Sequence, residues 1–347
     1  METARPSYTF SVIVAVITAF FGVSASNPAY AAERKSIRWA TTPTGTYGYK
    51  VAAQMTKVLE DALGGEYTVT VNPYQSPTVC MKALMDGNAE ISYTADVGIE
   101  QFLAGEGAFK NYTPKKPTIV HTWYAYPLEG FIAVHAPKAS QFKSWGDFSG
   151  KPVFFVTAGF MHWLNFKRIF KILGYQFNHV EIATAAIADA LQAGTIVGAV
   201  CYTTAGRGLP PFWREAELRI KINAINPSPV EVKKLTAAGL VPMEVDPKQA
   251  FSKDVGVKTI LGVPVLFGYN ARTDMPEEVV YKMLNKLYSE REGLAKADPG
   301  FLPMARDFVG MQVNGINANP TLPVHPGLAK FLKEKKAWNN KWKIAGN

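Results

Sequence analysis

A repeated alternation of extended and helical patterns restricts the fold of this 347-residue sequence more than any other feature. Residues 37–40, 67–71 and 90–94 are short stretches whose residue types are typical of strands. Residues 47–63 and 77–86, which lie between them, carry apolar side chains at helical spacing. A strand, a helix and a second strand in this order form a unit whose two strands are parallel. The sequence therefore predicts an α/β protein.

Two longer extended runs divide the sequence. Residues 118–136 read TIVHTWYAYPLEGFIAVHA, which is too long for one ordinary strand and is interrupted near Pro127. The second run, residues 257–272, reads VKTILGVPVLFGYNAR and also contains a proline and a glycine. Between the two runs, residues 137–245 repeat the alternation of strand and helix patterns. We interpret the two runs as a two-strand hinge between two lobes, each a mixed, mostly parallel sheet flanked by helices. One continuous large sheet with bulges is the alternative.

The N-terminal residues have the pattern of an export signal. Residues 8–23 are an almost uninterrupted apolar run, and Ala29-Tyr30-Ala31 has the spacing of a cleavage site, so we predict cleavage after Ala31 and a periplasmic protein. An uncleaved anchor is the alternative. The predicted boundaries are a signal peptide at 1–31, a discontinuous first lobe at 32–127 plus 265–347, and a second lobe at 128–264.

The chain has a formal net charge of +9, which suits nucleic acid, an anionic membrane or small anions. The lysines are scattered, and we interpret the densest group, at residues 330–343, as a solvated helix face. We therefore expect no nucleic-acid partner. The two cysteines, Cys80 and Cys201, fall in different predicted lobes, where a bond between them would oppose opening, so we expect two buried free thiols.

The common catalytic and nucleotide-binding signatures are absent from the sequence. It contains no GxxxxGK[ST], GxGxxG after a strand, HExxH or GxSxG motif, and its five histidines stand singly. We therefore expect no cofactor, no metal site and no enzyme activity. An exported enzyme of the same two-lobe shape is the alternative.

Candidate ligand-binding side chains gather where predicted strands end, because open α/β sheets bind ligands at that edge. In WATTPTGTYGYKVAAQM, residues 39–55, hydroxyl residues can cap a helix while free N–H groups face an anion. Asp96 is predicted to cap the helix after the third strand. Arg207 either contacts a carboxylate or is a surface charge, and the aromatic residues either form a wall of the site or pack the cores. The candidates are Thr44, Thr46, Tyr47, Gln75, Ser76, Tyr93, Asp96, Tyr126, Thr157, Phe160, His162, Tyr202, Thr204 and Arg207.

Several stretches, in order along the chain, resemble the TAXI family of extracytoplasmic solute-binding subunits of TRAP transporters. They are IRWATTPTGTYGY, SPTVCMKALMDGNAEISYTADVGIEQFLAG, AYPLEGFIAVHAPKASQFKSWGDFSGKPVFFVTAGF and LPVHPGLAKFLKEK. The resemblance implies a periplasmic-binding-protein type II fold and a monomer that closes on glutamate, 2-oxoglutarate or another carboxylate and passes it to TRAP membrane subunits. It places ligand groups at Thr44, Thr46, Tyr47, Gln75, Ser76, Tyr93, Asp96, Thr157 and Tyr202.

The sequence departs from the family pattern at two turns. The opening turn has Pro43 and one glycine, and GFMHW, residues 159–163, is bulkier than the usual small-residue turn. These departures leave room for an aromatic or larger carboxylate. The binding subunit of an ABC importer of the NMT1-like type, or a sensor input domain, has the same fold and is the alternative function.

Overall fold

A computed structural model describes residues 34–44, 46–116 and 118–346. The predicted signal peptide and its cleavage site after Ala31 lie outside these residues. No helix in the described part of the chain combines the length and apolar character needed to cross a membrane.

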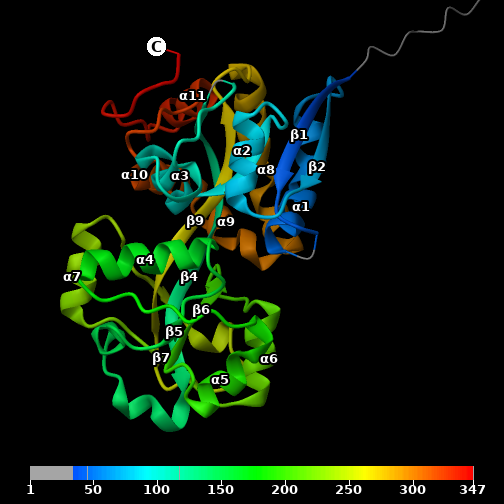
Figure 1. Ribbon diagram of the computed structural model, residues 1–347. Helices are drawn as coiled ribbons and strands as arrows, with labels where there is room; N and C mark the ends of the chain where they lie inside the picture. Colours follow the sequence, from blue (N-terminus) through cyan, green and yellow to red (C-terminus); the bar gives the residue numbers. More distant parts are fainter. Residues whose placement is uncertain (1–33, 45, 117, 347) are drawn as a thin grey trace, which may run out of the picture. The chain divides into compact units, whose positions relative to one another are not determined.

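The strands form one mixed sheet in the order β2-β1-β3-β9-β4-β6-β5, while β7 pairs with β4 and β8 with β9 (Figure 1). Strands β1, β2 and β3 are parallel, as the predicted strand and helix order requires, and β5 is parallel to β6. Strand β9 is antiparallel to both β3 and β4. The strands are β1 (Lys35–Thr41), β2 (Tyr67–Pro73), β3 (Ile91–Ala95), β4 (Ile119–His135), β5 (Val153–Phe154), β6 (Gly198–Thr204), β7 (Ile222–Ile225), β8 (Met243–Val245) and β9 (Ile260–Arg272).

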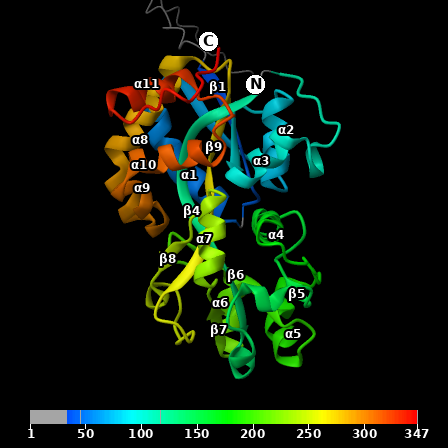
Figure 2. The same ribbon diagram turned by 90° about the vertical axis from the view of Figure 1, so that its left-hand side faces the viewer.

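Helices cover both faces of the β1 to β3 region. Helices α8 to α11 lie on one side of it, and α2 and α3 lie on the other (Figure 2). The helices are α1 (Tyr47–Ala62), α2 (Pro77–Met85), α3 (Asp96–Ala104), α4 (Met161–Leu173), α5 (Ile187–Ala193), α6 (Pro211–Arg219), α7 (Pro229–Ala237), α8 (Glu277–Ala297), α9 (Leu302–Arg306), α10 (Phe308–Ala318) and α11 (Pro326–Glu334).

The long strands β4 and β9 are each continuous, so the prediction that Pro127 interrupts the first of them was wrong. Pro127 pairs with Leu266 of β9, and its carbonyl accepts a hydrogen bond from Ala205 N–H at 3.1 Å. The residue therefore keeps its place in the ladder although it lacks a donor. Register shifts between β4 and β9 lie before it, between Val120 and Tyr126. A continuous sheet with bulges, the alternative reading, describes the strand pairing.

The buried apolar side chains nevertheless form two large clusters rather than one. Strand β4 contributes residues up to Tyr126 to the first cluster and residues from Phe131 onward to the second. Cys80 lies in the first cluster and Cys201 in the second, both as buried free thiols. The lobe boundaries at 32–127, 128–264 and 265–347 stay a prediction.

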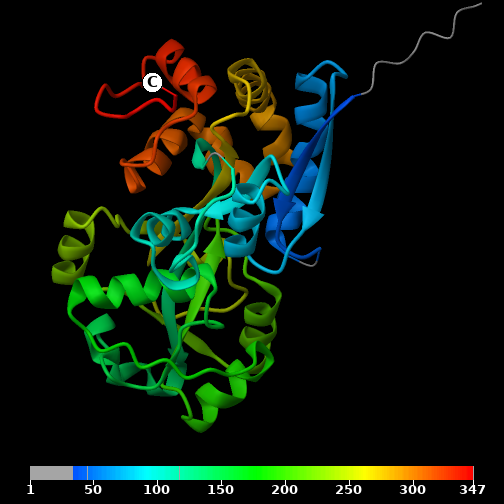
Figure 3. The same ribbon diagram turned by 45° about the horizontal axis from the view of Figure 1, so that its top comes forward.

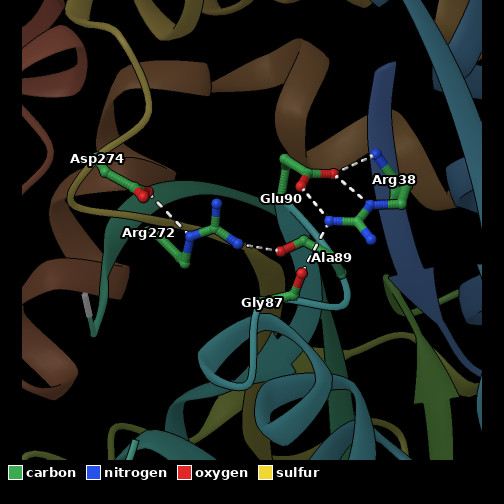
Figure 4. Close-up of polar contacts among 6 residues, drawn as sticks. All are labelled: Arg38, Gly87, Ala89, Glu90, Arg272 and Asp274. Atoms are coloured by element: carbon green, nitrogen blue, oxygen red, sulfur yellow. Dashed lines mark hydrogen bonds and ion pairs between the residues drawn. The ribbon is translucent and has the colours of Figure 1, made fainter. Parts of the chain in front are cut away.

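A polar network fastens the start of β3 to its neighbours (Figure 4). Arg38 of β1 donates from Nε and Nη2 to the carboxylate of Glu90 at 3.0 and 2.6 Å, and Nη2 also reaches Gly87 O at 2.8 Å. Arg272 at the end of β9 donates to Ala89 O at 2.7 Å. Burial opposes ionisation of Glu90, but the Arg38 contacts hold its pKa below the ordinary value. The network therefore fixes the N-terminal end of β3.

Candidate functional site

An open hollow of about 640 Å³ lies where β1 and β2 end. Its lining includes Thr44 from the loop after β1 and Gln75 from the loop after β2, together with Pro43, Pro73, Tyr74 and Val79. The volume is in the range of small-molecule sites. Helices α1 and α2 both begin beside these loops, so the positive ends of two helix dipoles adjoin the hollow.

Of the four residues predicted in these two loops, Thr46 and Ser76 already cap helices. Thr46 Oγ1 accepts from Tyr49 N–H at 3.3 Å at the start of α1, as the sequence predicts. Ser76 Oγ accepts from Val79 N–H at 3.3 Å at the start of α2. Within the described residues, the side chains of Thr44 and Gln75 have no hydrogen-bond partner. They are therefore the groups that a ligand in this hollow can use.

The first turn of α1 is anchored by Asp298, a residue that the sequence analysis missed. Tyr47 Oη donates to Asp298 Oδ1 at 2.7 Å, and Lys50 Nζ lies 2.7 Å from Oδ2. Gly300 N–H also donates to Oδ1, at 2.8 Å. Burial alone would raise the pKa of Asp298, but these three donors lower it below its ordinary value. The phenol proton of Tyr47 is used in this contact, so Tyr47 presents its ring rather than a free donor.

Tyr93 and Tyr126 form a buried pair behind the ring of Tyr47. Their hydroxyl oxygens are 2.5 Å apart. The Tyr126 ring meets the Tyr47 ring edge-on with centroids 5.1 Å apart, and it stacks on Phe267 at 5.7 Å. Burial raises the pKa of both tyrosines well above the ordinary value, so both stay protonated. The structure brings these three predicted tyrosines together, as a packed aromatic layer of the first core.

His162 and Tyr202 form a second aromatic pair, on α4 and β6. Their rings stack with centroids 4.6 Å apart, and the imidazole lies against Gly130 of β4, where an added Cβ would be 2.7 Å from Nδ1. Neither imidazole nitrogen has a hydrogen-bond partner among the described residues. Burial lowers the pKa of His162 to about 3, so the ring is neutral. His162 therefore supplies no positive charge for an anion.

Glu129, a second missed residue, holds the loop after β6. Its buried Oε2 accepts from Thr203 Oγ1 at 2.6 Å and from Gly206 N–H at 2.9 Å. Burial raises the pKa of Glu129 to about 7, because two hydrogen bonds only partly offset the cost of a charge without a cation. Two predicted residues adjoin this contact: Thr204 ends β6, and Arg207 lies in the loop after it. Arg207 Nη1 donates to Gln249 Oε1 at 2.9 Å.

Asp96 is the first residue of α3, and the N-cap is Ala95, so the prediction that Asp96 caps this helix was wrong. Its buried carboxylate instead accepts from Leu266 N–H of β9 at 2.9 Å and lies 3.3 Å from Arg168 Nη2. Arg168, the third missed residue, also contacts Glu100 at 2.6 Å. Burial raises the pKa of Asp96, and the charge of Arg168 opposes that shift. The contact joins α3, β9 and α4.

No group of three histidine, cysteine, aspartate or glutamate side chains in the described residues could hold a metal ion.

A search of curated proteins finds no match for this chain. The sequence does match the NMT1-like family, over residues 39–335. The chain belongs to the NMT1-like family. The resemblance to the TAXI family in particular stays a prediction.

Two solved structures are similar to this NMT1-like chain. MatC from Rhodopseudomonas palustris, with bound malate, is 14% identical with a TM-score of 0.51, over 82% of this chain and 96% of MatC. The periplasmic sulfonate-binding protein SsuA from Methylobacillus flagellatus KT is also 14% identical with a TM-score of 0.51, over 90% of this chain and 98% of SsuA. At 14% sequence identity, the similarity to these two structures is evidence for the fold alone. The predicted periplasmic-binding-protein type II fold is confirmed.

The predicted site residues of this NMT1-like chain divide among several sets. Thr44 and Gln75 are available at the hollow, and the others are engaged with neighbours or lie at turns. Thr157 is half-buried and Phe160 is 55% exposed, both in the turn before α4. The engaged residues are Thr46 and Ser76 as caps; Tyr47, Tyr93 and Tyr126 as one aromatic layer; His162 and Tyr202 as a stack; Asp96 on Arg168; Thr204 at the end of β6; and Arg207 in the loop that Glu129 holds.

Proposed function

We propose that this chain is an extracytoplasmic solute-binding protein that captures a small organic anion and delivers it to a membrane transporter. The observation that carries the proposal is the hollow at the ends of β1 and β2. Two helices begin there, and Thr44 and Gln75 face it without partners among the described residues. Helix starts and neutral donors suit the binding of an anion. Family membership and the fold support the same function.

The proposal includes two lobes that close on the solute. The boundaries are 32–127 plus 265–347 for the first lobe and 128–264 for the second. Two separate buried clusters, with β4 and β9 passing from one to the other, support this division. Two crossing strands can act as a hinge because each changes direction through a few residues.

The solute that we propose is a small carboxylate, with an aromatic acid or a sulfonate as close relatives. MatC has bound malate, and SsuA is named for sulfonate binding, so both proteins of this fold have an anion in their description. In this chain, Arg168 and Arg207 already contact Asp96 and Gln249, and His162 is neutral. Neutral hydroxyl, amide and backbone donors would therefore hold the anion. No catalytic group or cofactor is needed for capture and release.

Two kinds of membrane partner are proposed. The ordered resemblance to TAXI proteins favours the membrane subunits of a TRAP transporter. The NMT1-like match, together with the likeness to SsuA, favours the alternative, an ABC importer. In both cases the chain works as a periplasmic monomer after removal of residues 1–31.

A thermal-shift screen of protein beginning at residue 32 tests the proposal. The panel contains mono- and dicarboxylates, keto acids, aromatic acids and sulfonates, with amines and neutral sugars as controls. A true solute raises the melting temperature increasingly with its concentration, because it binds the folded state alone. The Thr44→Val/Gln75→Leu variant should lose that shift. The proposal is contradicted if no anion raises the melting temperature, or if the variant shows the same shift as the wild type.

A further inference from the structure

The C-terminal residues carry an unusual concentration of positive charge. Residues 326–346 contain six lysines and one glutamate. Lys330 pairs with Glu278 at 2.6 Å, and Glu334 accepts hydrogen bonds from Tyr281. The other five lysines form no ion pair with any described residue. We call these five the C-terminal basic surface: Lys333, Lys335, Lys336, Lys341 and Lys343.

Packing and hydrogen bonds hold this segment on the folded chain. Trp342 is buried and donates from Nε1 to Asn317 Oδ1 at 3.2 Å, and its ring meets the Trp338 ring at 5.4 Å. Ile344 forms a β-bridge with Val324. The residues after α11 therefore fold back toward the start of that helix rather than extending into solvent. Figure 3 marks the end of the chain near α11.

Two of the lysines lie over aromatic rings. Lys333 lies over the Trp338 ring at 5.4 Å, and Lys335 lies over the Tyr288 ring at 4.2 Å. Lys341 and Lys343 flank the buried Trp342 and are exposed, as are Lys333 and Lys336. The charges therefore lie on one ordered segment, with the half-buried Trp338 among them.

We propose that the C-terminal basic surface binds the anionic headgroups of a lipid bilayer. Clusters of four to eight basic residues bind anionic membranes, and tryptophan is favoured at the membrane interface. The choice of lipid as partner rests on the proposed function, because a protein that delivers solute to a membrane transporter works within reach of headgroups. Such binding would confine the chain to the membrane surface and raise its encounter rate with the transporter.

Vesicle co-sedimentation tests the proposal. Mature protein is mixed with vesicles of phosphatidylcholine containing phosphatidylglycerol, or of phosphatidylcholine alone, at low and high salt. We expect binding to the anionic vesicles that salt weakens, and none to the neutral ones. The variant Lys333→Gln/Lys336→Gln/Lys341→Gln/Lys343→Gln should bind at least tenfold more weakly. Lys335 is left unchanged because it packs on Tyr288 and Phe331.

A matched control separates this surface from net charge. Lys143→Gln/Lys171→Gln/Lys233→Gln/Lys258→Gln removes the same charge from exposed lysines elsewhere that have no ion pair with a described residue. We expect it to bind within about threefold of the wild type. The four-arginine variant at positions 333, 336, 341 and 343 should keep full binding, because it keeps the positive charge at these positions.

Three outcomes would overturn the proposal. They are absence of binding by the wild type at low salt, equal loss in the two glutamine variants, and tighter binding of the wild type to a DNA duplex than to anionic vesicles. The thermal-shift screen is measured separately in each variant. Retained solute binding with no vesicle binding rejects the lipid surface alone, whereas vesicle binding without any solute shift rejects the proposed function alone.

Discussion

Tyr47 donates its phenol proton to Asp298 at 2.7 Å, which joins the first turn of α1 to the segment after α8. Lys50, one turn further along α1, contacts the other carboxylate oxygen at 2.7 Å. The buried carboxylate thus fixes the start of the helix that borders the hollow. A residue far from the hollow in sequence therefore holds the helix that begins beside it.

Replacing Asp298 with alanine should lower the free energy of unfolding by about 2–3 kcal/mol, because hydrogen bonds to a buried charge are lost. Tyr47→Phe removes one of those bonds and should cost about 1 kcal/mol. Urea unfolding at pH 7 measures both. The contacts lower the pKa of Asp298, so its contribution is present above the unfolded pKa of 3.8 and is lost as the pH falls through the folded pKa. Equal stability of Asp298→Ala and wild type at pH 7 would contradict this role.

Glu129 should make the free energy of unfolding depend on pH in the opposite direction. Its pKa rises from 4.5 in the unfolded chain to about 7 in the folded protein, so the folded state binds the proton more tightly. The stability that protonation provides is complete below about pH 4.5 and is lost as the pH rises through 7. At about 1.4 kcal/mol per pKa unit, the loss reaches about 3 kcal/mol. Chemical unfolding between pH 4.5 and 8 measures it.

The control for this prediction is Glu129→Gln, which keeps a side-chain oxygen for Thr203 and Gly206 but does not titrate. Its stability should vary less than that of the wild type over the same pH range. Identical pH profiles for the two proteins would show that Glu129 does not titrate in this range, and that another group causes the slope.

The local elements of the fold could be predicted because each depends on neighbouring residues. The helix expected at 47–63 is α1 (Tyr47–Ala62), and the strand expected at 67–71 is β2 (Tyr67–Pro73). The cap at Thr46 follows from the same short-range chemistry. The continuity of β4 could not be read in this way. It depends on Pro127 meeting Leu266 of β9, a partner from a distant part of the chain.

The same limit explains the missed site residues. Asp298 meets Tyr47 across 251 positions, Glu129 meets Thr203 across 74, and Arg168 meets Asp96 across 72. A single sequence has no signal for such pairs, because an isolated charged residue is most often solvated. The residues Asp298-Pro299-Gly300 are typical of a turn, but a turn pattern does not indicate which side chain the carboxylate contacts.

Thr44 and Gln75 should affect solute binding without affecting the empty protein. Thr44→Val and Gln75→Leu remove polar groups that have no partner in the described residues, so each variant should melt within about 2 °C of the wild type, as surface changes do. The solute found in the screen should bind each variant at least tenfold more weakly, about 1.4 kcal/mol. Calorimetry measures the affinity.

Ser76→Ala, at the position after Gln75, is the contrasting variant. Its hydroxyl caps α2, so its loss should lower stability by about 1 kcal/mol. We expect a smaller effect on solute affinity than in Thr44→Val. A pattern in which Thr44→Val destabilises the empty protein and Ser76→Ala does not would show that the two roles are assigned the wrong way round.

The contact of Arg168 with Asp96 predicts a non-additive pair of substitutions. Arg168→Gln leaves a buried carboxylate without its cation and should cost about 3–5 kcal/mol at pH 8. Burial already raises the pKa of Asp96, and the variant should raise it further, so protonation should make the loss smallest near pH 4. Asp96→Asn combined with Arg168→Gln should be more stable at pH 8 than Arg168→Gln alone, because no buried charge remains. Urea unfolding of the two single variants and the double variant completes the double-mutant cycle. If the losses of stability are additive, the two side chains do not interact energetically. Glu100 and Asn165 alone would then hold the guanidinium of Arg168.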